Sequence, residues 1–215
     1  MLFTGDSITD CGRVRPVGMD AGLGEGYVAF VDGLLAACYP QRRIRVLNTG
    51  ISGNRVIDLE ARWQTDVLDF KTDWLSVMIG INDVCWQFSK ALDPNQVGIE
   101  RYESTYRKLL ERTRPNLKGL VLMTPYFIEP NVSEPIRERM DAYGKVVERL
   151  AGEFNAVFVN VQAAFDLHLA HRPRQSLCGD RVHPNKTGHM IIAKSFLTAM
   201  EFDWTLAGKP AGSDA

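Results

Sequence analysis

This chain of 215 residues lacks the features of several specialised protein classes. It has no apolar run long enough to cross a bilayer, which argues against a helical membrane protein. Its 25 basic and 26 acidic residues leave a formal net charge of −1, so neither a nucleic acid nor an anionic membrane is expected as partner. Only Met1–Thr4 precede the first motif, which leaves no room for a signal peptide and predicts a cytoplasmic location.

Cysteine and histidine are also scarce. The four cysteines are far apart and form no Cys-x-x-Cys pair, so we predict reduced thiols rather than a zinc site or a redox motif. Cys11 lies four residues beyond Ser7, but a small packing residue is its favoured interpretation. With only four histidines, a two-metal centre has few candidate ligands.

Short β-branched runs alternate with longer helical patterns along the chain. We expect strands at Leu2–Thr4, Ile44–Asn48, Trp74–Ile79, Gly119–Thr124 and Ala156–Val161, and helices at Gly26–Ala37, Val56–Val67, Asn95–Thr113, Ile136–Phe154 and Lys186–Met200. This alternation predicts an α/β fold, a three-layer α/β/α sandwich with a five-stranded parallel sheet. We expect a single domain over residues 1–207 and a disordered tail over 208–215. The first strand is short, or the natural protein begins earlier than Met1.

Two motifs near opposite ends of the chain supply the groups of a serine hydrolase. Ser7 follows Gly5-Asp6, and Asp180 precedes His183 by three residues. A serine becomes nucleophilic when a histidine takes its proton, and a carboxylate orients that histidine. The non-catalytic alternatives are a helix N-cap role for Ser7, a turn-forming role for Asp180 and an ordinary surface position for His183. Together the three residues predict acyl transfer.

Two other strand ends carry groups that can stabilise an oxyanion. Asn82 follows an apolar strand, and its side-chain amide can donate a hydrogen bond. Gly50 follows another strand, permits close backbone approach and can donate its N–H. Ser7 can offer its own backbone N–H. Because ligands bind beyond the carboxyl ends of parallel strands, we expect all these groups at one edge of the sheet.

These residues resemble the four sequence blocks of the SGNH hydrolases, also called GDSL-type esterases and lipases. The blocks are Gly5–Thr9, Asn48–Asn54, Gly80–Asp83 and Asp180–Pro184, and they occur in the family's order. The resemblance implies a flavodoxin-like fold, a nucleophile at Ser7, a base at His183 and an orienting acid at Asp180. It also implies an oxyanion hole made by Ser7, Gly50 and Asn82, with no metal and no organic cofactor.

A narrower resemblance, carried by Ser7–Arg13, Gly26–Ala29, Met78–Val84 and Met123–Pro125, points to bacterial acetyl-xylan esterases of this fold. It implies an intracellular homo-oligomer that removes acetyl groups from xylo-oligosaccharides or other acetylated sugars. The chain departs from that group in its shorter N-terminus and in Gly179, where a bulky aromatic is expected. Both departures bear on the substrate more than on the chemistry.

Aromatic side chains are the candidates for sugar stacking. We predict that Trp86, Tyr126 and Phe127 bind substrate, whereas Trp63, in the middle of a helix, is favoured as a core residue. The main alternative function is a lysophospholipase or thioesterase that acts on longer acyl chains. More remote alternatives are a metal-dependent phosphoesterase, suggested by the carboxylates of Asp6 and Asp10, and a carbohydrate-binding module with a degenerate site.

Overall fold

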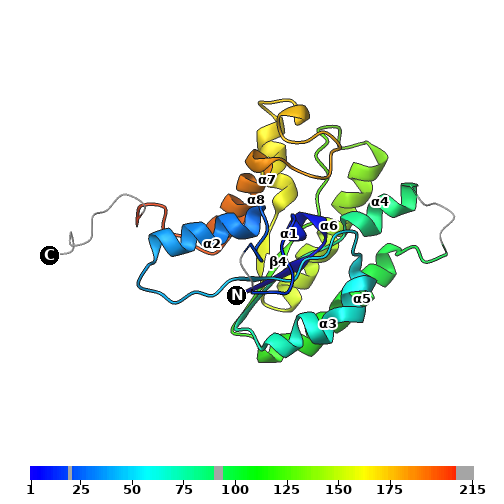
Figure 1. The fold of residues 1–215 in the computed structure, drawn as a ribbon. Coiled ribbons are helices and arrows are strands. Elements are labelled where there is room, and N and C mark those ends of the chain that lie inside the picture. Colours follow the sequence, from blue (N-terminus) through cyan, green and yellow to red (C-terminus); the bar gives the residue numbers. More distant parts are fainter. Residues whose placement is uncertain (19–20, 90–93, 207–215) are drawn as a thin grey trace.

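The computed structural model describes residues 1–18, 21–89 and 94–206 (Figure 1). Five parallel strands form one sheet in the order β2-β1-β3-β4-β5. The strands are β1 (Leu2–Gly5), β2 (Leu47–Asn48), β3 (Trp74–Met78), β4 (Gly119–Met123) and β5 (Val157–Val159). This confirms the predicted five-stranded parallel sheet. The single domain over 1–207 stays a prediction, and the predicted tail, 208–215, lies outside the described residues.

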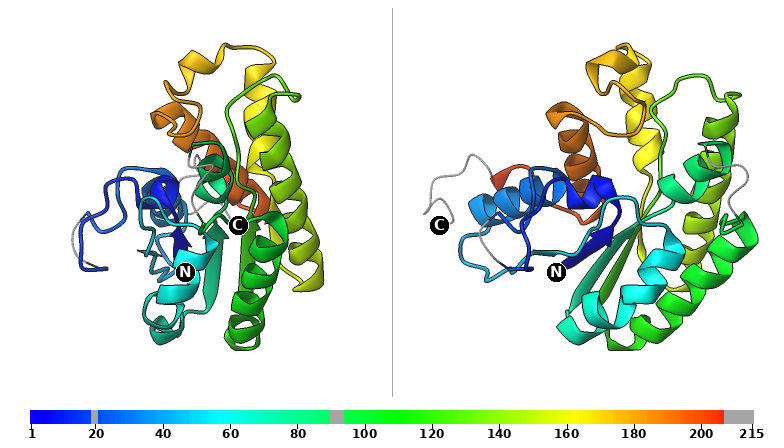
Figure 2. Two further views of the ribbon diagram at one scale, coloured as in Figure 1. Left: turned by 90° about the vertical axis from the view of Figure 1, so that its right-hand side faces the viewer. Right: turned by 45° about the vertical axis from the view of Figure 1, so that its right-hand side comes forward.

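Helices cover both faces of the sheet, as Figures 1 and 2 show. One layer contains α2 (Tyr27–Cys38), α7 (Val161–Leu169) and α8 (Lys186–Ala199). The other contains α3 (Val56–Asp66), α5 (Ile99–Thr113) and α6 (Pro135–Glu153), with α4 (Ile81–Ser89) beside α6. Short 3₁₀ turns span Leu68–Phe70, Arg114–Asn116 and Arg174–Ser176, and α1 (Ser7–Asp10) is a single turn of helix.

The strands contribute side chains to two hydrophobic clusters, because successive side chains point to opposite faces of a sheet. Leu120 and Leu122 of β4 join the cluster under α3, α5 and α6, whereas Val121 and Met123 join the one under α2, α7 and α8. Trp63 is fully buried in the first cluster, and its Nε1 donates to Thr113 Oγ1 at 2.8 Å. Its core role is thereby confirmed.

β2 and α4 are among the elements that differ from the sequence prediction. β2 contains only Leu47 and Asn48, since Ile44 and Arg45 before it are exposed at the sheet edge and pair with no strand among the described residues. The sequence pattern also missed α4, which contains the β-branched residues Ile81 and Val84 and the aromatic residues Trp86 and Phe88. This helix begins directly after Gly80, so it carries Asn82 in its first turn.

Among the residues that the structure describes, no helix is both long enough and apolar enough to span a membrane.

Candidate functional site

The nucleophile candidate lies where β1 ends. Asp6 caps α1 by accepting a hydrogen bond from Ile8 N at 3.0 Å, so Ser7 is the first residue of the helix rather than its cap. The alternative of Ser7 as an N-cap is therefore wrong. Gly5 permits this tight turn, because a Cβ there would lie 2.2 Å from Met78 O. The turn leaves Ser7 half-buried, with its Oγ 3.0 Å from His183 Nε2.

Asp180 and His183 form one compact unit. Asp180 Oδ2 lies 2.6 Å from His183 Nδ1, and its Oδ1 accepts hydrogen bonds from the backbone N–H groups of Val182 and His183. Partial burial opposes ionisation, but these hydrogen bonds outweigh it and lower the pKa of Asp180 to about 2. An ionised Asp180 accepts a hydrogen bond from the Nδ1–H of His183, which leaves Nε2 without a hydrogen and able to accept the Ser7 hydroxyl proton.

Two buried carboxyl groups lie behind the serine. Burial raises the pKa of Asp6 to about 7 and that of Asp83 to about 8, although each accepts backbone hydrogen bonds. Asp83 accepts from Val56 N with both oxygens, at 3.0 and 3.2 Å. This bond ties the first turn of α4, and therefore Asn82, to the start of α3.

Asn82 is placed as an amide donor in this turn. Its Nδ2 donates one hydrogen bond to Asn54 O at 3.0 Å. A side-chain amide nitrogen carries two hydrogens, so a second donor remains for a substrate. The bond also places the loop around Asn54 beside α4.

The predicted role of Gly50 needs correction. Its only N–H donates to Asn48 Oδ1 at 2.8 Å. The Asn48 amide is held in turn by Thr9 O at 2.6 Å and Leu23 O at 2.9 Å, which fixes its orientation. Gly50 is buried, and a Cβ there would lie 2.4 Å from Asp10 N. The structure therefore makes Gly50 a close-packing residue against α1, with its donor already committed.

Sequence reasoning missed Gly53, three residues further along the same block. It is exposed, has a φ of +82° and would have open space around an added Cβ. Within the described residues its N–H has no hydrogen-bond acceptor, and its neighbour Asn54 binds Asn82. Both glycines stand in the block Asn48–Asn54, and only the backbone conformation distinguishes them.

Two of the three aromatic side chains that were predicted to bind substrate are buried. Tyr126 and Phe127 are only 1% and 2% exposed, so they are core residues and the prediction that they bind substrate is wrong. Trp86 is half-buried on α4, and the Arg55 guanidinium lies 4.3 Å from its ring centroid. Arg55 therefore packs against the ring of Trp86.

Cys11 and His189 form a pair that the proposed mechanism does not use. Tyr27 N donates to His189 Nδ1 at 3.2 Å, and His189 Nε2 lies 3.4 Å from Cys11 Sγ. Burial lowers the pKa of His189 to about 4 and raises that of Cys11 above its ordinary value. A neutral imidazole that accepts at Nδ1 carries its hydrogen on Nε2, so it cannot take the thiol proton. Cys11 and His189 are therefore best described as packing residues.

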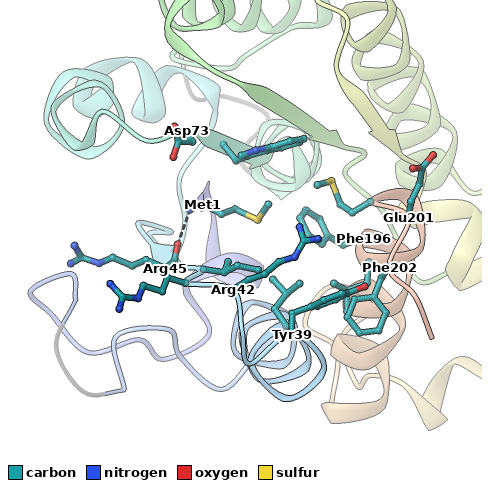
Figure 3. A pocket seen from close by; sticks show the side chains of 14 residues that line it. Met1, Tyr39, Arg42, Arg45, Asp73, Phe196, Glu201 and Phe202 are labelled. Carbon is teal, nitrogen blue, oxygen red and sulfur yellow. Dashed lines mark hydrogen bonds between the residues drawn. The ribbon is translucent and has the colours of Figure 1, made fainter. Parts of the chain in front are cut away.

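A cavity of about 570 Å³ lies elsewhere on the molecule (Figure 3). Met1 and Trp74 line it from the amino ends of β1 and β3, and Tyr39 and Phe202 line it from the chain after α2 and α8. Ser7 and Asn82 follow the carboxyl ends of the strands, so this cavity is at the wrong edge of the sheet to serve them.

Comparison with known proteins agrees with this geometry. The GDSL-like lipase/acylhydrolase family matches residues 3–191. An acetylxylan esterase of Geobacillus stearothermophilus is 51% identical over 207 residues, which are 95% of this chain and 94% of the relative. The chain therefore belongs to the GDSL-like lipase/acylhydrolase family, as the sequence blocks predict, and it is a carboxylic ester hydrolase.

Solved structures show the same relationship. The acetylxylan esterase Axe2 of Geobacillus stearothermophilus superposes with a TM-score of 0.92 at 51% identity, over 94% of each chain. LAE5, an α/β hydrolase from the metagenome of Lake Arreo, superposes with a TM-score of 0.91 at 46% identity, also over 94% of each chain. Three Axe2 structures are of catalytic mutants, in which a serine, an aspartate or a histidine is replaced by alanine.

Proposed function

We propose that this protein is a serine esterase that removes acetyl groups from xylo-oligosaccharides or related acetylated sugars. The observation that carries the proposal is the continuous chain of contacts from Ser7 Oγ through His183 to Asp180, at 3.0 and 2.6 Å. The relative that is 51% identical along nearly its whole length is an acetylxylan esterase. In the Axe2 catalytic mutants, the replaced aspartate and histidine are three residues apart, as Asp180 and His183 are here.

The proposed mechanism has two steps. Ser7 Oγ attacks the acetyl carbonyl carbon while His183 Nε2 accepts the hydroxyl proton, and His183 then gives this proton to the leaving sugar oxygen. Water attacks the resulting acetyl-serine while His183 accepts its proton, and His183 then returns this proton to Ser7 Oγ as the acyl bond breaks and acetate leaves. The negative carbonyl oxygen is stabilised by Ser7 N–H and by the free hydrogen of Asn82 Nδ2. For the third donor we propose Gly53 N–H in place of Gly50.

The open site favours a small acyl group on a bulky alcohol. The side chains of Asp180 and His183 are 55% and 58% exposed, so the reacting carbonyl is approached from solvent. A long acyl chain requires a buried apolar groove to compensate for its ordering, whereas an acetyl group requires little more than the oxyanion donors. Trp86, which is half-buried beside Arg55, is the remaining aromatic candidate for contact with the sugar.

The first test compares hydrolysis of p-nitrophenyl acetate and p-nitrophenyl octanoate, with and without phenylmethylsulfonyl fluoride. We expect inhibited activity that favours acetate, followed by acetate release from acetylated xylo-oligosaccharides. A preference for octanoate would support the lysophospholipase or thioesterase alternative instead. Loss of activity in EDTA would support a metal-dependent phosphoesterase, although no three His, Cys, Asp or Glu side chains gather as metal ligands within the described residues.

Replacing the nucleophile gives the matched genetic test. Ser7→Ala is expected to fold normally and to lose hydrolysis of both esters, because no other hydroxyl lies against His183 in the described part of the chain. Ser104→Ala, on the exposed side of α5, serves as the control. Hydrolysis by the Ser7 variant at the control's rate would refute the nucleophile assignment. Sugar binding without hydrolysis by the wild type would favour a binding module.

Two further parts of the proposal concern the state of the protein in the cell. We propose a homo-oligomer, supported by exposed apolar side chains such as Leu167 (74%) and Trp204 (43%). We also propose a cytoplasmic location, on the basis of the resemblance to intracellular esterases. Light scattering on a sizing column tests the first part, and cell fractionation tests the second.

A further inference from the structure

We propose that Arg181 is a positioning residue, which holds Asp180 and His183 over Ser7 by fixing their loop to the segment that precedes α6. We call residues 178–184 the base loop and residues 126–134 the anchor segment. The inference rests on the proposed function, because it takes Asp180 and His183 as the orienting acid and the base. Figure 2 shows the base loop in orange and the anchor segment in green.

The base loop is closed by its own contacts at its ends. Cys178 and Pro184 form an isolated antiparallel bridge, and Asn185 N donates to Leu177 O at 2.7 Å. The bonds between Asp180 and His183 are internal to the loop as well. These contacts set the shape of the loop, but they do not determine its distance from Ser7, which lies on a different element.

Backbone contacts to the anchor segment supply part of that placement. Ile128 N donates to Arg181 O at 2.9 Å. The buried Tyr126 donates its hydroxyl to Val182 O at 3.1 Å. Both acceptors lie between Asp180 and His183 in the sequence, so a shift of the anchor segment would carry the acid and the base with it.

The side chain of Arg181 supplies the other part. Its NH1 lies 3.2 Å from Glu129 Oε2 and 3.6 Å from Glu134 Oε1. Its guanidinium also stands 4.9 Å from the ring centroid of the buried Phe127. A planar guanidinium is suited to such a combined carboxylate and ring contact, which lysine cannot reproduce. Arg181 adopts a φ of +68°, an unfavourable conformation for a residue with a side chain, so surrounding contacts must maintain it.

The anchor segment is itself firmly held. Gln162 accepts from Phe127 N at 2.7 Å and donates to Phe127 O at 3.2 Å. Arg137, whose side chain is only 4% exposed, donates to Glu129 O at 2.7 Å and pairs with Asp166 of α7. The base loop is therefore attached, through Arg181, to a segment that α6 and α7 immobilise.

Arg181 acts on position rather than on the charge of the acid. The oxygens of Asp180 accept from Val182 N, His183 N and His183 Nδ1, whereas the Arg181 guanidinium points to two glutamates of the anchor segment. Loss of the guanidinium would displace the acid and base together and leave the bond between them intact. A change of about 1 Å in such an arrangement can lower a rate by roughly 100-fold.

The test compares Arg181→Ala and Arg181→Lys with Arg149→Ala, which removes a surface arginine paired with Glu103. Each variant is assayed for kcat and KM on p-nitrophenyl acetate, for the pH dependence of kcat/KM and for thermal stability. We expect Arg181→Ala to lower kcat by about 10- to 100-fold with little change in KM. The acid limb of its pH profile should stay in place, because Asp180 still pairs with His183. Arg181→Lys should recover only part of kcat.

The outcomes separate the inference from the function it rests on. An inactive wild type would refute the proposed esterase. An active wild type, with Arg181→Ala matching Arg149→Ala in kcat, would refute the positioning role alone, as would a change in KM at constant kcat or a shifted acid limb. If Arg181→Ala fails to fold, the double variant Glu129→Gln with Glu134→Gln removes both ion pairs of Arg181 from the other side, and a wild-type kcat in that variant would overturn the inference.

Discussion

Asn82→Ala is the sharpest test of the oxyanion hole, because the structure limits what this side chain can do. Its Nδ2 has two hydrogens, and Asn54 O takes one at 3.0 Å. One hydrogen is left for the carbonyl oxygen of the substrate. Removal of one such donor costs about 2.7–4 kcal/mol in the transition state, which corresponds to a loss of roughly 10²–10³ in kcat.

The effect on folding should be much smaller. Asn82 is half-buried, and the hydrogen bond to Asn54 joins two neutral groups. Loss of such a bond costs about 1 kcal/mol of stability. A large loss of kcat in a folded variant would therefore report on chemistry rather than on unfolding.

The assay measures kcat and KM for p-nitrophenyl acetate, beside the melting temperature of each variant. Asn116→Ala is the control, because Asn116 is exposed in the turn after α5 and far from the reactive groups in the sequence. The reasoning is refuted if Asn82→Ala keeps kcat within about fivefold of the control, or if only KM rises. Either result would mean that Asn82 does not stabilise the transition state selectively.

Three further predictions follow from the same structure. Gly50→Ala should lower stability by roughly 1–3 kcal/mol through a clash with the backbone of α1. Gly53→Ala meets no neighbouring atom, but a φ of +82° strains its backbone, so it should lower stability and, by shifting the proposed donor N–H, also lower kcat; a kcat for Gly53→Ala no lower than that for Gly50→Ala would contradict the proposed exchange of roles. Because burial lowers the pKa of His189 from 6.5 to about 4, the unfolded state binds the extra proton between these values. His189 should therefore cost up to about 3 kcal/mol of stability as the pH falls from 6.5 to 4, a loss that unfolding curves of His189→Gln should not show. Trp63→Phe removes the buried bond to Thr113 and should lower stability by about 1–3 kcal/mol with kcat unchanged, as melting and kinetic measurements would show.

The sequence predicted most of the architecture because the relevant signals are local. The expected helix over 186–200 is observed as Lys186–Ala199, and the expected strand over 74–79 as Trp74–Met78. In contrast, β2 was predicted too long, since Ile44 suits a strand by propensity but lies exposed outside the pairing with β1. Pairing with a neighbouring strand, rather than propensity, decides where a strand begins.

In the candidate site too, local features could be predicted from the sequence and long-range features could not. The pairing of Asp180 with His183 follows from a separation of three residues, which one tight loop satisfies without help from the rest of the chain. In the sequence alone, Gly50 and Gly53 are equally good candidates for the oxyanion donor. Their roles differ because Asn48 takes the N–H of one, while the other has a positive φ and an exposed backbone.

The sequence by itself therefore determined the α/β alternation, the four family blocks and the local partnership of Asp180 with His183. Only the tertiary structure brought Ser7 to His183 across 176 positions of sequence and buried the aromatic residues that were expected to face a sugar. It also attached the base loop to the anchor segment through Arg181. The physical reason is that hydrogen bonds within a few residues depend on local geometry, whereas burial and long-range contacts depend on which elements pack together.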